Sequence, residues 1–95
     1  MNQAVYDKQS KTKMLVGLSN RGGLQQDSFS VWFNKEYGAY ALNNEAVQVI
    51  NNDSKNLSIK LFMGTWCGDS RREVPRIYRI LDAADFDESR LTLIN

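Results

Sequence analysis

The segment from Leu61 to Pro75 restricts the folds open to this chain more than any other part of the sequence. A short apolar run ends in a Trp-Cys-Gly turn, and a helical pattern that contains a proline follows directly. The only cysteine, Cys67, therefore lies where a strand passes into a helix. Such a position can expose a thiol and lower its pKa, because the unpaired N–H groups of the first helical turn face it.

Hydrophobic periodicity places this turn inside a strand–helix–strand unit. Strands are predicted over residues 58–63 and 91–94. Between them, apolar residues recur at helical spacing at Val74, Ile77, Tyr78 and Leu81. A crossover of this length joins parallel strands, and its connection is almost always right-handed. The second half of the chain is therefore predicted to be an α/β unit.

Two helices are expected before this unit. Five aromatic residues recur at steps of three and four: Phe29, Trp32, Phe33, Tyr37 and Tyr40. They indicate a helix with an N-cap at Asp27-Ser28, whose aromatic face seals a core rather than forming a ligand cage. A shorter helix is predicted from a cap at Asn43-Asn44 to about residue 53. Residues 1–25 are polar and turn-rich, so we expect a mobile arm before a domain at 26–95, with only residues 14–18 against the core.

Composition argues against several classes of function. The 95 residues carry 12 Lys and Arg against 11 Asp and Glu, so no basic excess suggests a nucleic acid partner. The lack of histidine removes His-based catalysis and His metal ligands, and one cysteine forms neither an internal disulfide nor a Cys-rich zinc site. We therefore expect no cofactor and no metal. No apolar run has the length of a membrane span or a secretory signal, so the expected location is the cytoplasm, away from the membrane.

Two interpretations of Cys67 are open from the residues alone. Free cysteines are usually buried and act as small hydrophobic side chains. The glycines that flank Cys67 instead favour a turn and a partly exposed thiol, which Arg71 and Arg72 would help to ionise and Asp69 would not. Four arginines lie off the apolar stripe of the following helix and form either a solvated face or an anion-binding patch: Arg71, Arg72, Arg76 and Arg79.

The run Phe62-Met63-Gly64-Thr65-Trp66-Cys67-Gly68-Asp69-Ser70, with Pro75 eight positions after the cysteine, resembles the active-site turn and helix of the thioredoxin-like superfamily. The likeness covers about residues 61–94 and is strongest to bacterial members with a Trp-Cys-Gly-Asp-Ser turn, whose aromatic helical preface also looks similar. It implies an α/β, incomplete thioredoxin-like fold with N-terminal helices before the strand–helix–strand unit. It also implies that Cys67 is the nucleophile, Trp66 the flanking aromatic and Pro75 a helix kink.

The sequence departs from the family pattern at two points. Ser70 stands at the position of the resolving cysteine, and a hydroxyl can stabilise a thiolate but cannot displace a disulfide. The resemblance therefore implies a monothiol that exchanges with a protein or small-molecule disulfide. The chain also stops before the family's cis-proline loop, hairpin and last helix. The strand at 59–63 would then have an unpaired apolar edge, open to self-association.

Two other functions stay open beside monothiol exchange by an oxidoreductase. One is a non-catalytic, thioredoxin-like interaction module that keeps the scaffold, and the other is a truncated fragment without activity. The alkylation rate of Cys67 separates the first function from the others. A Cys67→Ser variant that still binds its partner would favour the interaction module.

Overall fold

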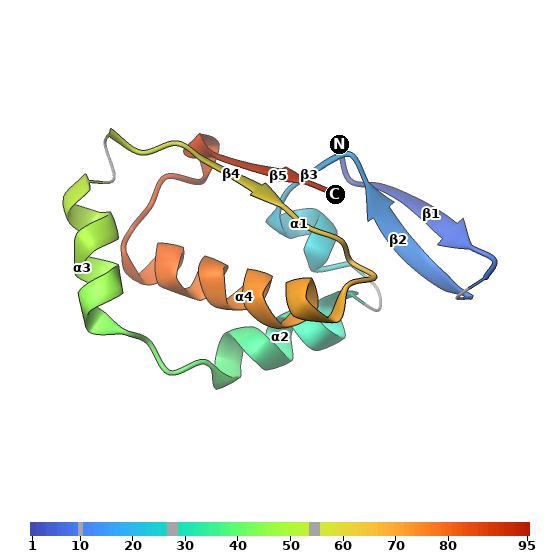
Figure 1. The fold of residues 1–95 in the computed structure, drawn as a ribbon, viewed down its shortest axis with the longest axis horizontal. Helices are drawn as coiled ribbons and strands as arrows, with labels where there is room; N and C mark the ends of the chain where they lie inside the picture. The colour runs from blue at the N-terminus through green and yellow to red at the C-terminus, as the bar shows by residue number, and fades with distance from the viewer. Residues whose placement is uncertain (10, 27–28, 54–55) are drawn as a thin grey trace.

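The computed structural model describes residues 1–9, 11–26, 29–53 and 56–95 (Figure 1). In chain order its elements are β1 (Gln3–Asp7), β2 (Thr12–Val16), β3 (Leu18–Ser19), α1 (Arg21–Leu24), α2 (Phe29–Ala39), α3 (Asn44–Asp53), β4 (Ile59–Phe62), α4 (Gly68–Ala83), the 3-10 helix η2 (Glu88–Arg90) and β5 (Leu91–Ile94). The mixed α/β class is confirmed. Among these helices none combines the length and the apolar character needed to cross a membrane.

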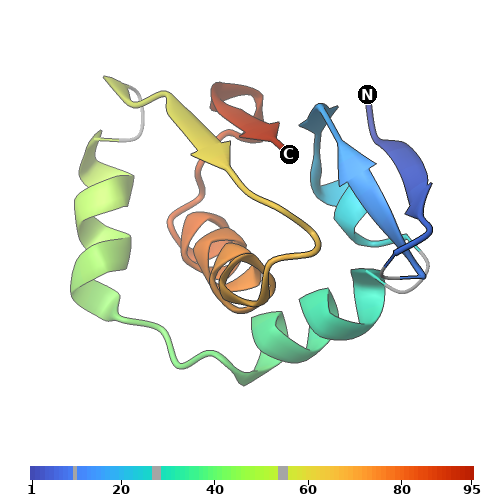
Figure 2. The ribbon, with the colours of Figure 1, turned by 45° about the vertical axis from the view of Figure 1, so that its right-hand side comes forward.

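Of the two sheets in the described residues, the larger has three strands in the order β3-β5-β4. β4 runs parallel to β5 with Leu61 opposite Leu93, and β3 runs antiparallel to β5 with Ser19 opposite Leu93. The predicted strand–helix–strand unit is thus confirmed, with the first strand one residue shorter at each end. α4 lies against one face of this sheet, and α2 packs on α4 (Figure 2).

The aromatic helix is also confirmed, and it supplies much of the core. Phe29 and Phe33 of α2 are buried, and the Phe33 ring meets the Tyr78 ring of α4 edge-on at 5.7 Å between centroids. The last aromatic of the pattern, Tyr40, follows the end of α2. The expected cap at Asp27-Ser28 lies outside the described residues. The cap of α3 forms at Asn43, whose Oδ1 accepts hydrogen bonds from the next helical N–H groups.

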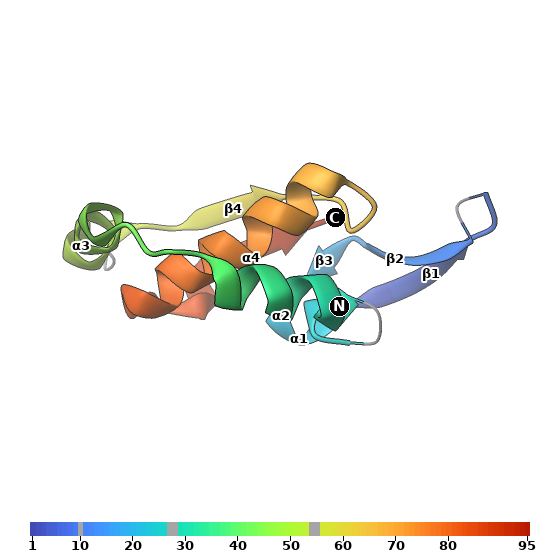
Figure 3. The same ribbon diagram turned by 90° about the horizontal axis from the view of Figure 1, so that it is seen from below.

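Residues 1–25, expected to form a polar arm with residues 14–18 against the core, contain three strands and a short helix where the structure describes them, and the expected core contact is made by Leu15. β1 and β2 pair as an antiparallel hairpin that extends from the body (Figure 3), and β3 and α1 follow it. Leu15 of β2 and Leu24 of α1 are fully buried in the core. The reason is alternation: in a strand only every second side chain faces inward, so a polar segment can contribute a single buried leucine.

Both ends of the chain are fastened at the corner between β2 and β3. The Asn2 N–H donates to the Leu18 carbonyl, and the Asn95 N–H donates to the Gly17 carbonyl, each at 2.9 Å. Gly17 has φ of 73°, a backbone conformation that favours glycine. The two termini therefore lie close together (Figure 1).

Most of the α4 arginines form neither a free solvated face nor an open anion patch, whereas Arg72 has its side chain 51% exposed. Three of them lie over aromatic rings of the α2 region, at 5.4 to 6.0 Å from the ring centroids: Arg71 over Trp32, Arg76 over Tyr40 and Arg79 over Tyr37. Arg76 also pairs with Glu36 of α2 at 3.3 Å. These side chains hold α2 against α4, each with a contribution on the order of 0.5–1 kcal/mol for a cation over an aromatic face.

A polar network joins four elements around Asp82 of α4. The Asp82 carboxylate accepts hydrogen bonds from Arg21 of α1 and from the Tyr37 hydroxyl of α2, and Arg21 also pairs with Glu88 of η2. Burial on its own would raise the pKa of Asp82, but the hydrogen bonds from Arg21 and Tyr37 outweigh it and lower the pKa below its ordinary value. The ionised carboxylate is therefore the form that the fold stabilises.

Leu15→Ala tests whether the hairpin belongs to the core. We expect the free energy of unfolding in urea to fall by about 2–5 kcal/mol, because the substitution leaves a cavity at a fully buried position. Val31→Ala is the control, since Val31 is 72% exposed on α2 and should change stability by no more than about 0.5 kcal/mol. Equal stability of the two variants would show that the hairpin is a separate arm.

The Asp82 network predicts a loss of stability in acid. A carboxyl group with a lowered pKa in the folded chain contributes its stabilisation fully above the unfolded-state pKa, near 4, and loses it as the pH falls through the folded-state pKa. Asp82→Asn should therefore destabilise the chain more at pH 7 than at pH 3 in urea unfolding. Tyr37→Phe, which removes one donor, should give a smaller difference of the same sign. A destabilisation by Asp82→Asn that does not depend on pH would contradict this.

Candidate functional site

Cys67 occupies the N-cap of α4, at the end of a turn that leaves β4. Its backbone is extended, with φ of −94° and ψ of 123°, and the helix begins at Gly68. The Cys67 N–H donates to the Gly64 carbonyl and the Cys67 carbonyl accepts from the Arg71 N–H, both at 3.0 Å. The thiol is exposed. The structure therefore agrees with the interpretation of Cys67 as an exposed thiol in a turn and not with a buried, inert side chain.

The surroundings of the sulfur favour its thiolate form. The Ser70 amide N–H is the largest influence, followed by the Asp69 amide N–H and the Ser70 hydroxyl, and together they lower the pKa of Cys67. Desolvation and the charge of Asp69 oppose them and are weaker. The neutral side chain makes no capping hydrogen bond of standard geometry. The donors thus act mainly on the negative charge that appears when the thiol ionises.

The arginines expected to activate the thiol have other partners. Arg72 bonds to Asp69 at 3.0 Å and to Glu73 at 2.8 Å, on the outer side of the first turns of α4. The Nε of Arg71 donates to the Thr65 carbonyl at 2.6 Å. The lowered pKa of Cys67 therefore comes from the helix N-terminus and Ser70, rather than from a counter-ion.

Ser70 links the two ends of the turn. Its Oγ accepts a hydrogen bond from the Gly64 N–H at 3.2 Å, which leaves the hydroxyl hydrogen free to be donated toward the sulfur. Gly64 is close to the indole of Trp66, since a Cβ at Gly64 would lie 2.7 Å from that ring. The Trp66 side chain is 53% exposed. The structure thus brings Trp66, Cys67, Gly68, Asp69 and Ser70 together in one turn.

Pro75 lies inside α4, one and a half turns beyond this group, and is buried. Because proline has no N–H, the Arg71 carbonyl lacks its usual helical donor. The kink expected at Pro75 stays a prediction. Pro75 makes no part of the turn around the thiol, and its contribution is to the packing of α4.

Thr65 is the residue of this region that sequence reasoning missed. A threonine between glycine and an exposed tryptophan is normally expected to face solvent, but Thr65 is only 1% exposed. Its Oγ1 accepts a hydrogen bond from the Leu15 N–H of β2 at 3.2 Å. That partner is 50 residues away in the sequence, and no local pattern predicts the contact.

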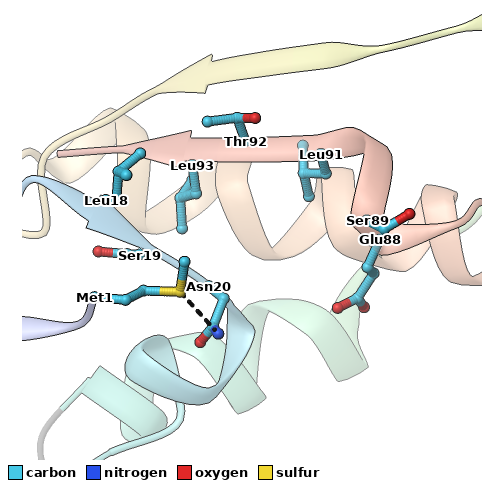
Figure 4. A pocket seen from close by; sticks show the side chains of 9 residues that line it. All are labelled: Met1, Leu18, Ser19, Asn20, Glu88, Ser89, Leu91, Thr92 and Leu93. Atoms are coloured by element: carbon cyan, nitrogen blue, oxygen red, sulfur yellow. Dashed lines mark hydrogen bonds between the residues drawn. The ribbon is translucent and has the colours of Figure 1, made fainter.

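A cavity of about 480 Å³ lies elsewhere, at the fork where β3 separates from β5 (Figure 4). It is lined by Met1, Leu18, Ser19, Asn20, Glu88, Ser89, Leu91, Thr92 and Leu93. Two of its polar groups have partners: the Asn20 amide donates to the Met1 sulfur at 3.3 Å, and Glu88 pairs with Arg21. None of the predicted site residues lines it. Within the described ranges, no group of three or more acidic or cysteine side chains is arranged to hold a metal ion.

No protein-family model, no curated protein and no solved structure matches this chain. The likeness to the thioredoxin-like superfamily therefore depends on the sequence pattern of about residues 61–94 and the aromatic helix before it, with no support from the comparisons. What the site can do chemically follows from its own geometry: it presents one accessible thiol whose ionised form is stabilised by N–H and O–H donors.

The pH dependence of Cys67 alkylation tests this geometry. We expect the reaction of the folded chain to follow an apparent pKa below that of the same chain in denaturant. Ser70→Ala should raise this pKa because it removes the hydroxyl donor, while Asp69→Asn should lower it further because it removes an opposing charge. Identical profiles for the folded and denatured chains would show that the helix N-terminus does not activate the thiol.

Proposed function

We propose that this chain is a thioredoxin-like thiol–disulfide exchange protein that acts as a monothiol through Cys67. The observation that carries the proposal is the exposed sulfur at the N-terminus of α4, where two amide N–H groups and the Ser70 hydroxyl lower its pKa. A thiolate is the reactive species in disulfide exchange, and a lowered pKa increases its fraction near neutral pH.

The reaction has two balanced steps. The Cys67 thiolate attacks one sulfur of a protein or small-molecule disulfide, a new S–S bond forms to Cys67, and the other sulfur leaves as a thiolate that takes up a proton from water. The chain has no second cysteine to resolve this mixed disulfide. An external low-molecular-weight thiol must therefore attack, as its thiolate, the substrate sulfur of this mixed disulfide. A new S–S bond then joins that thiol to the substrate half, and Cys67 leaves as a thiolate. Such thiols are abundant in the cytoplasm, the location that we propose.

The residues of the turn have distinct parts in this reaction. Ser70 stabilises the thiolate, and Gly68 and Asp69 form the first turn of α4 that directs the amide groups toward the sulfur. Trp66 offers a half-exposed apolar surface next to Cys67, against which a substrate can lie. Asp69 tempers the activation, because its negative charge opposes that of the thiolate.

A second candidate, a non-catalytic interaction module, has one observation in its favour. Within the described residues β4 is an edge strand, paired with β5 and with no other strand, and its Phe62 side chain is 72% exposed. An edge of this kind can pair with another strand, including β4 of a second copy. Light scattering of Cys67→Ser over a range of concentrations tests it. Self-association that Phe62→Glu abolishes and Val49→Glu does not would support pairing at this edge, and a monomer at every concentration would contradict self-association through β4.

Mixed-disulfide formation tests the exchange reaction itself. Incubation of the chain with an aromatic disulfide should add one substrate half to Cys67, visible as a mass increase, and Cys67→Ser should prevent it. Ser70→Cys should release the bound half without added thiol, because a second thiol now lies one helical turn away. Ser70→Ala is its control and should keep the adduct. A chain that stays unmodified while the denatured chain reacts would contradict the proposed function.

A further inference from the structure

The outer edge of β2, in the N-terminal hairpin, contacts the turn that carries Cys67. Leu15 of β2 faces Ala4 of β1, but its N–H donates to the Oγ1 of Thr65 at 3.2 Å rather than to the hairpin partner. Leu15 and Thr65 are both buried, with exposed fractions of 0% and 1%. The threonine hydroxyl thus takes the place that a carbonyl of a neighbouring strand would have along β2.

The same threonine is held from the other side by α4. Its carbonyl accepts the hydrogen bond from the Arg71 Nε at 2.6 Å, and the Arg71 N–H in turn donates to the Cys67 carbonyl at 3.0 Å. Thr65 is therefore tied to the hairpin through its side chain and to the first turn of α4 through its backbone. Only Trp66 separates it from Cys67, so a shift of Thr65 moves the sulfur relative to the amide groups that stabilise its thiolate.

We infer that Thr65 is a positioning residue through which the hairpin β1–β2 sets the reactivity of Cys67. The inference rests on the proposed function, because it concerns the same thiol. Loss of the Thr65 hydroxyl leaves the buried Leu15 N–H without its acceptor, and the pair then separates so that water can reach this N–H. The turn moves with Thr65, and the donors at the N-terminus of α4 lose their alignment with the sulfur.

Thr65→Val and Thr65→Ser are the matched pair that tests this. Valine keeps the shape of threonine but removes the acceptor, whereas serine keeps the hydroxyl and should restore the wild-type behaviour. The readout is the pH profile of Cys67 alkylation, in variants shown by circular dichroism to be folded. For Thr65→Val we expect the apparent pKa to rise and the rate at pH 7 to fall by about 2- to 10-fold, in proportion to the thiolate fraction.

A second pair of variants tests the hydrogen bond between Arg71 and the Thr65 carbonyl. This pair also keeps the inference testable if Thr65→Val does not fold. Arg71→Lys keeps the charge but loses the Nε that donates to the Thr65 carbonyl, so it should slow alkylation in the same direction. Arg72→Lys, at the next position and bonded to Asp69 and Glu73 instead, is the control and should keep the wild-type profile.

The outcomes separate this inference from the proposed function. A folded Thr65→Val chain with the wild-type pH profile would overturn the positioning role, as would a Thr65→Ser chain that behaves like Thr65→Val. A role limited to stability would lower the urea midpoint of Thr65→Val without any change in the thiol profile. By contrast, the wild-type chain could show the same pH profile of Cys67 alkylation when folded and when denatured. That result would overturn the proposed activation of the thiol, whatever the Thr65 variants do.

Discussion

The burial of α4 between the sheet and α2 is the constraint on which the other features depend. Tyr78 lies near its middle, 1% exposed, with the Phe33 ring on one side and the Arg21 guanidinium 4.7 Å from its ring centroid. Burial raises the pKa of Tyr78 to about 12, so this side chain stays neutral within the core. With α4 held in this way, its N-terminal turn lies at the margin of the core, and Cys67 is exposed to solvent there.

Polar contacts complete what apolar packing begins. In a chain of 95 residues the core is small, and side chains at its margin have a large share in orienting the elements. The Asp82 network joins α2 to α4 at one end of the helix pair. The arginines that lie over aromatic rings join the two helices along their length. The site at the N-terminus of α4 is thereby kept in place by interactions that lie far from the thiol.

Periodic segments could be predicted from the sequence, whereas contacts between distant segments could not. The aromatic steps from Phe29 and the apolar steps from Val74 each lie within one helix, so local spacing was enough to place α2 and α4. The parallel pairing of β4 with β5 followed from the length of the crossover. The exposed position of Cys67 followed from the glycines around it.

The hairpin and Thr65 illustrate the opposite case. β2 contributes one fully buried residue, Leu15, and one inward side chain is too weak a signal to distinguish a strand from a polar arm. The buried Thr65 bonds to that same strand, 50 residues away in the chain. The partners of the arginines were hidden for the same reason, because charge spacing on α4 does not reveal which aromatic rings α2 brings beside it.

The corner at Gly17 has a consequence for how the molecule can be joined to anything else. Since Asn2 and Asn95 bond to adjacent carbonyls there, the two ends of the polypeptide leave the fold from the same place. A short linker between them would close the backbone into a ring without disturbing the sheet, and new ends could then be opened in an exposed loop. The fold is thus suited to circular permutation, and a protein fused at either end would stand over the same corner of the sheet.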